Sequence, residues 1–164
     1  MLTRSALFLA CATLAACGQQ SPPAAPAAPA GAPPAIAPPA AAATFTRKAA
    51  PDGAMAYIIE PVDGATVTSP VHVVFGLKGI GVAPAGTDRP DAGHHHLLID
   101  AGLPADLSLP IPSDDTHKHF GGGQTETALT LAPGKHTLQL LLGDHLHVPF
   151  EPPIASSVVT IEVQ

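Results

Sequence analysis

The sequence predicts an all-β fold: an antiparallel immunoglobulin-like β-sandwich of about seven strands, preceded by a signal peptide and a disordered Ala/Pro linker. Three observations predict it. Short apolar and β-branched runs alternate with turns rich in Pro and Gly along residues 51–164, which is typical of sandwiches. No segment keeps a helical period over about 11 residues. Residues 51–164 are also numerous enough to build one modest hydrophobic core.

The strands follow from the positions of these runs. We expect strands over residues 56–59, 71–77, 93–100, 126–131, 135–142 and 156–163. A turn at Pro133 and Gly134 separates two of them, and His136 stands near the start of the strand that follows. Many sandwiches place a Tyr near such a corner, hydrogen-bonded back to the backbone. We therefore interpret His136 as structural, with metal ligation as its alternative.

The first residues read as a targeting signal. Arg4 is followed by an apolar run, residues 5–16, which is too short to span a bilayer but fits a secretory signal. The run ends in Leu-Ala-Ala-Cys-Gly, which resembles the lipobox of bacterial lipoproteins and makes Cys17 the lipidated residue. An ordinary cleaved signal is the alternative. Gly18 after the cysteine favours sorting to the outer membrane, facing the periplasm of the bacterial cell envelope.

Residues 17–50 are predicted to be a linker. Their composition is almost entirely Ala and Pro between residues 21 and 43, which cannot bury a core and favours polyproline II. We expect a tether between the lipid on Cys17 and the folded domain, with a docking site for a proline-binding partner as the alternative. The predicted organisation is thus a lipoprotein signal peptide over 1–16, the lipidated linker over 17–50 and a His-rich β-sandwich over 51–164.

Charge and cysteine content exclude several classes of function. The net charge is −6, and all 13 acidic residues lie in 51–164 with only four of the seven basic residues, so nucleic acid is not an expected partner. Cys11 leaves with the signal and Cys17 carries lipid, so the predicted mature domain holds no thiol. A metal site there would have to use His, Asp, Glu or water.

Nine histidines are the unusual feature of the composition. Six of them form three H-x-H pairs, and residues i and i+2 of a strand share a face, so each pair can present two imidazoles to one ion. Imidazole suits copper and zinc. The candidate metal ligands are His94, His96, His117, His119, His145 and His147.

Carboxylates stand near these pairs in the sequence, at Asp100, Asp114, Asp115 and Asp144. They can act as further ligands or can orient the imidazoles by hydrogen bonds. The alternative for each pair is a solvated strand edge or a buried hydrogen-bond network. The sequence does not say which histidines point inward, because either face of the 93–100 strand can be the core.

The histidine blocks also carry a resemblance. GHHHLLID (93–100), HKHFGGGQTE (117–126) and PGKHTLQLLLGDHLHVPFEPP (133–153) are similar to domain of unknown function 4399, a family found in bacterial secreted proteins and lipoproteins. The resemblance covers roughly residues 55–164 and implies a shared fold and a shared His-rich surface, without an established activity. Phe150 departs from the family pattern, which tends to have His at this position.

No catalytic motif accompanies the histidines. Gly79 and Gly81 lack the spacing of a dinucleotide fingerprint, and no Ser stands in a nucleophile elbow. We interpret Gly121–Gly123 as a turn, with close approach of a ligand as the alternative. The leading hypothesis is a membrane-tethered module that binds copper or zinc as a buffer, carrier or sensor. The alternatives are a metal-free sandwich that recognises an envelope protein or glycan, and an enzyme of the copper-zinc dismutase type.

Overall fold

The computed structural model describes residues 45–164. In this part of the chain two β-sheets pack face to face, with no helix. The predicted signal peptide, Cys17 and the linker as far as residue 44 lie outside the described residues. The strands are β1 (Met55–Glu60), β2 (Ala65–Val67), β3 (Val71–Lys78), β4 (Gly81–Val82), β5 (Ala92–Ile99), β6 (His117–His119), β7 (Glu126–Leu129), β8 (Gly134–Gly143) and β9 (Val159–Val163).

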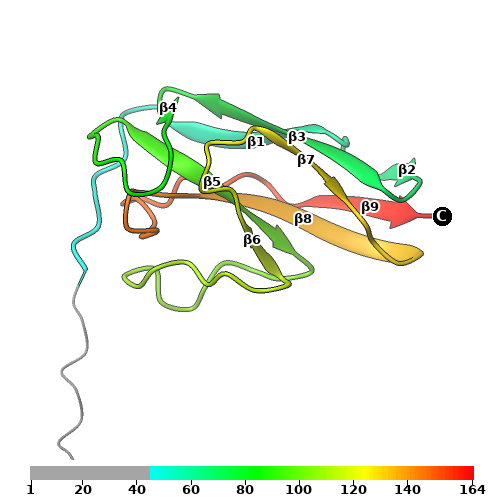
Figure 1. Ribbon diagram of the computed structural model, residues 1–164. Coiled ribbons are helices and arrows are strands. Elements are labelled where there is room, and N and C mark those ends of the chain that lie inside the picture. The colour runs from blue at the N-terminus through cyan, green and yellow to red at the C-terminus, as the bar shows by residue number, and fades with distance from the viewer. Residues whose placement is uncertain (1–44) are drawn as a thin grey trace, which may run out of the picture. The chain divides into compact units, whose positions relative to one another are not determined.

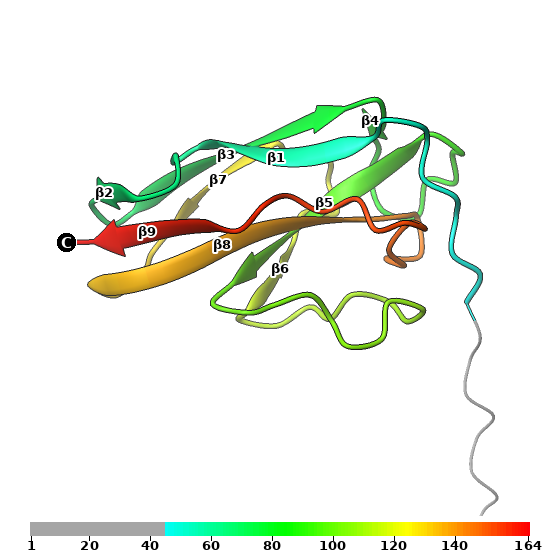
Figure 2. The same cartoon turned by 180° about the vertical axis from the view of Figure 1, so that it is seen from behind.

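The smaller sheet has the order β1-β3-β7, and the larger has the order β2-β9-β8-β5-β4, with β6 also paired to β5. Figure 1 shows the small sheet above the large one, with β6 and the loop before it below β5. Seen from behind in Figure 2, β9 and β8 run side by side beneath β1. Most pairings are antiparallel, and only β2 with β9 and β4 with β5 are parallel.

The predicted all-β sandwich is confirmed. All six expected strands are present, and the structure adds the short strands β2, β4 and β6. These three have only two or three residues each, so they leave almost no periodic pattern in the sequence. The assignment to the immunoglobulin type stays a prediction.

β5 lies near the middle of the large sheet and is buried on both faces. Its odd-numbered residues, among them Leu97 and Ile99, face the main core between the sheets. On the opposite face, Leu98 packs with Ile111 and Leu141 beneath the loop that leads to β6. This second covered face lets β5 bury polar side chains away from the main core.

The segment before β1 also contacts the domain. The backbone N–H of Ala50 donates to the backbone oxygen of Glu151, and the N–H of Glu151 donates to the backbone oxygen of Lys48, both at 2.8 Å. Arg47 forms an ion pair with the side-chain carboxylate of Glu151. Residues 47–50, which the prediction assigned to the linker, therefore pack against the sandwich. Among the described residues no helix is long and apolar enough to cross a membrane.

Candidate metal centre

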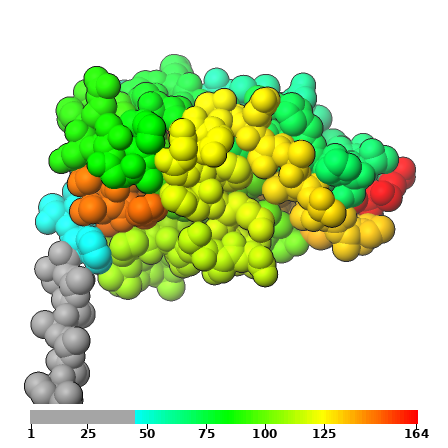
Figure 3. Space-filling view, in the orientation of Figure 1, coloured from blue at the N-terminus to red at the C-terminus, as the bar shows by residue number. Residues whose placement is uncertain are grey.

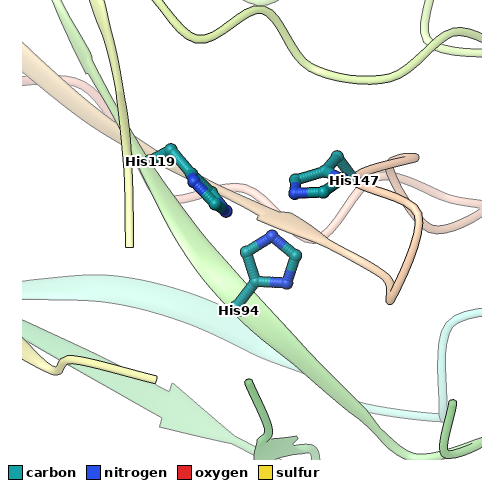
Figure 4. Close-up of side chains that lie close together, drawn as sticks. All are labelled: His94, His119 and His147. Carbon is teal, nitrogen blue, oxygen red and sulfur yellow. The ribbon is translucent and has the colours of Figure 1, made fainter. Parts of the chain in front are cut away.

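Three histidines from three separate segments converge on the outer face of the large sheet. His94 belongs to β5, His119 ends β6, and His147 lies in the turn after β8 (Figure 4). One ring nitrogen of each lies within 4.8 Å of the others, and no carboxylate of the described residues belongs to this group. The group is thus made only of neutral nitrogen donors of the kind that bind zinc and copper.

The alternation of β5 decides which histidines reach this group. His94 and His96 point to the outer face, while His95 points to the core and packs against Phe75 with ring centres 5.1 Å apart. His94 is fully buried, and neither of its ring nitrogens has a hydrogen-bond partner among the described residues. A buried polar group without a partner is costly, so the site is built around a nitrogen that an ion can satisfy.

β6 brings His119 to the site through its pairing with β5. His119 stands opposite His96 in this antiparallel ladder, and its ring centre is 5.0 Å from that of His94. Gly121 leaves the space that the ring of His119 occupies, because a Cβ at this glycine would lie 2.3 Å from Cε1 and 2.6 Å from Nε2 of His119. The glycines after β6 therefore do more than make a turn.

His147 is presented by a turn that Asp144 organises. The carboxylate Oδ1 of Asp144 accepts hydrogen bonds from the backbone N–H groups of Leu146 at 2.8 Å and Val148 at 3.0 Å. The backbone oxygen of Asp144 accepts a further one from His147 at 2.9 Å. His147 has a positive φ of 68°, a conformation that needs such outside support. Figure 3 shows this turn, coloured orange, at the surface of the domain.

The surroundings of His94 and His119 favour the neutral form of their imidazoles. Burial, followed by the neighbouring imidazoles of His147 and His119, lowers the pKa of His94 from 6.5 to about 4. Burial and His147 also lower the pKa of His119. A neutral imidazole keeps a lone pair for a metal ion, whereas an imidazolium does not. At neutral pH the site is therefore ready to coordinate without first losing protons from these two rings.

His96 borders the same group. Its ring centre lies 4.9 Å from that of His94, 5.1 Å from that of His119 and 5.9 Å from that of His147. It is fully buried, and neither ring nitrogen has a partner. Burial and the neighbouring imidazoles lower its pKa to about 2.

The structure does not bring His117 and His145 into this group. Nδ1 of His117 is 3.0 Å from the carboxylate of Asp114, and this contact stabilises the loop before β6. Nδ1 of His145 lies 3.5 Å from Asp88 and 3.6 Å from Asp144. Residues 145–147 form a turn and not a strand, so the alternation rule does not apply to them.

His136, on β8, has a structural role, as predicted. Nδ1 of His136 is 2.7 Å from a carboxylate oxygen of Asp100, and Nε2 is 2.9 Å from the backbone oxygen of Ala132. Both ring nitrogens face acceptors, and this arrangement raises the pKa of His136. Asp100 is thereby engaged at the far end of β5, away from the histidine group.

Two residues shape the site in ways that the sequence does not predict. The sequence suggests Asp144 as a ligand or as an acceptor for an imidazole, but its carboxylate holds the backbone of the turn. Gly143 was not singled out, although a Cβ there would lie 3.0 Å from Cε1 of His96 and 3.2 Å from Cα of His147. A Gly-Asp pair that ends a long apolar strand and precedes a histidine is the signal that could have pointed to both.

Comparison with known protein families identifies one matching family. Its sequence pattern, described as "Domain of unknown function (DUF4399)", matches residues 73–164, which include most of β3, all of β4 to β9, and the four clustered histidines. No curated protein and no solved structure is significantly similar to the chain. The match covers more than half of the sequence, and the chain therefore belongs to the DUF4399 family.

Proposed function

We propose that this protein binds one divalent transition-metal ion, zinc or copper, through His94, His119 and His147, and acts as a buffer, carrier or sensor in the bacterial cell envelope. The observation that carries the proposal is the group of three ring nitrogens within 4.8 Å of one another, one of them on a fully buried, unpartnered histidine. Scattered surface histidines would instead be solvated and apart.

The chemistry of the donors supports zinc or copper over other ions. Imidazole is a preferred ligand of these metals, whereas calcium and magnesium prefer oxygen. Met55 is the only sulfur-containing side chain among the described residues and lies on β1. Thiolate and thioether chemistry is therefore not part of this site.

We further propose that Cys17 is lipidated and anchors the protein to the outer membrane, facing the periplasm. The order of a basic residue, an apolar run, small residues and a cysteine within the first twenty positions supports this placement. The linker rich in Ala and Pro would then hold the domain away from the membrane surface.

Isothermal titration of the full-length chain with Zn(II) and Cu(II), against a competing chelator, tests the metal proposal. Cys11→Ser and Cys17→Ser remove competing thiols from the sample. We expect one ion per chain in wild type and loss of tight binding in His94→Ala. Weak uptake of several ions, unchanged in that variant, would show that no preorganised site exists.

One observation favours the metal-free binding function as a second candidate. The outer face of β1 exposes Met55, Tyr57 and Ile59, with 51%, 41% and 46% of their surface accessible. The ring of Tyr57 covers Gly76, where a Cβ would lie 2.2 Å from it. An exposed apolar row with a flat aromatic ring can bind an envelope protein or glycan. In that case His96→Ala combined with His119→Ala would leave function unchanged.

A further inference from the structure

The arrangement of the four clustered rings carries a geometric argument about coordination. Five of the six separations between the ring centres of His94, His96, His119 and His147 lie between 4.7 and 5.1 Å, and the sixth is 5.9 Å. Four points at nearly equal mutual distances are the corners of a tetrahedron. A single metal ion at the centre of such a tetrahedron requires ring centres at a particular separation.

The size agrees with a zinc ion at the centre. With zinc–nitrogen bonds of about 2.0–2.1 Å in tetrahedral geometry, the centres of two coordinated imidazole rings lie about 5.2 Å apart. A square-planar site would instead need two opposite pairs of rings at about 6.3 Å and four neighbouring pairs at about 4.5 Å. Only His96 and His147 approach the larger value, and the opposite pair, His94 and His119, is 5.0 Å apart.

We propose that His96 is the fourth ligand, so that the site is closed and tetrahedral and favours Zn(II) over Cu(II) more than a site of three histidines would; this inference rests on the proposed metal-binding function. Cu(II) prefers tetragonal coordination, whereas zinc has no such preference. A closed site leaves no position for a substrate or an activated water. The bound ion is then cargo or a structural element and not a catalyst.

The fold provides both the reason for His96 and the room for it. Its two ring nitrogens are buried without a partner, as are those of His95, but only His96 faces the rings of the other three histidines, where an ion can offset the cost of this burial. The ring must approach His147 by about 0.7 Å to reach the tetrahedral separation. Gly143 leaves space beside both residues, because a Cβ at this position would lie 3.0 Å from Cε1 of His96 and 3.2 Å from Cα of His147.

Cobalt(II) spectroscopy and two leucine variants test the inference. The samples are full-length chains with Cys11→Ser and Cys17→Ser. His95→Leu is the matched control for His96→Leu, because both histidines are fully buried and unpartnered on adjacent positions of β5 but face opposite sides. Each variant replaces an unsatisfied imidazole with an apolar side chain of similar size, and melting of the metal-free form verifies folding.

We expect wild type and His95→Leu to give the intense visible bands of tetrahedral Co(II) and to bind Zn(II) equally well. His96→Leu should lose at least about tenfold in zinc affinity, since even the loss of a residue that only supports a ligand costs 10- to 100-fold. Azide should bind to the Co(II) form of His96→Leu, which has a vacant position, and not to that of wild type. In dialysis against equal Zn(II) and Cu(II), the ratio of bound zinc to copper should fall in His96→Leu.

Three results would overturn the inference while leaving metal binding intact. They are azide binding to the wild-type Co(II) form, an unchanged spectrum and zinc affinity in His96→Leu, and an unchanged zinc-to-copper ratio in that variant. The azide result needs no variant, so it decides the question even where a variant fails to fold. Absence of any stoichiometric ion in wild type would instead refute the proposed function itself.

Discussion

Gly121→Ala perturbs the metal site while keeping every imidazole. The added Cβ would lie 2.3 Å from Cε1 and 2.6 Å from Nε2 of His119. Carbon atoms in contact normally stay about 3.5–4.0 Å apart, so the ring must move by roughly 1 Å. His119 is exposed and can swing toward solvent, so the free energy of unfolding should change by no more than about 0.5 kcal/mol.

Metal affinity should respond far more strongly than stability. A displaced ligand is comparable to the loss of a residue that orients a ligand, which costs about 10- to 100-fold in affinity, or roughly 1.4–2.7 kcal/mol. Chelator-competed titration with Zn(II) measures the affinity, and urea unfolding measures the stability. Gly102→Ala is the matched control, because a Cβ there meets nothing within 4 Å.

Zinc binding by Gly121→Ala as tight as that of Gly102→Ala, at equal stability, would contradict this prediction. His119 would then not occupy a ligand position. A large loss of stability in Gly121→Ala alone would also contradict it, because the closest atoms to the new methyl group belong to the movable ring of His119, and the next neighbour, Cβ of Ala85, lies 3.3 Å away.

Three further predictions concern the turn held by Asp144, the loss of stability at low pH, and the ion pair between His136 and Asp100. Asp144→Ala should weaken zinc binding about 10- to 100-fold by releasing the turn that presents His147, while Asp144→Asn, which keeps one acceptor oxygen, should lose less in the same titration. Metal-free protein should lose stability as the pH falls from 6.5 toward 4, because His95 takes up a proton in the unfolded chain but not in the folded one, where burial lowers its pKa to about 4. This histidine alone accounts for about 3 kcal/mol at most. Urea unfolding of His95→Leu across this pH range should therefore show a shallower decline. His136→Leu should lower the free energy of unfolding by about 1.5–3 kcal/mol at pH 6, where the imidazolium donates to Asp100, and by less at pH 9. The pKa of His136 is raised in the folded state, so the stability it contributes is complete below pH 6.5 and is lost as the pH rises through the folded pKa. Equal losses at the two pH values would refute the ion pair.

The sequence determined the fold class and the types of donor atom that a metal site could use. Alternation and turn residues predicted six strands, because side chains in a strand face opposite sides with period two. The same rule placed His94 and His96 on one face, opposite His95. The absence of thiols from residues 51–164 limited any metal site in the predicted domain to nitrogen and oxygen donors. Each of these conclusions needs only local geometry or composition.

Tertiary structure alone decided which histidines meet. His94 and His96 face outward from the core because β3 and β8 supply the apolar partners of the other face, and that depends on sheet packing. His147 joins the group and His145 does not because the carboxylate of Asp144 folds residues 144–148 into a turn, where period-two alternation no longer holds. His94, His119 and His147 lie 25 and 28 residues apart in the chain, and only long-range strand pairing fixes their separation in space.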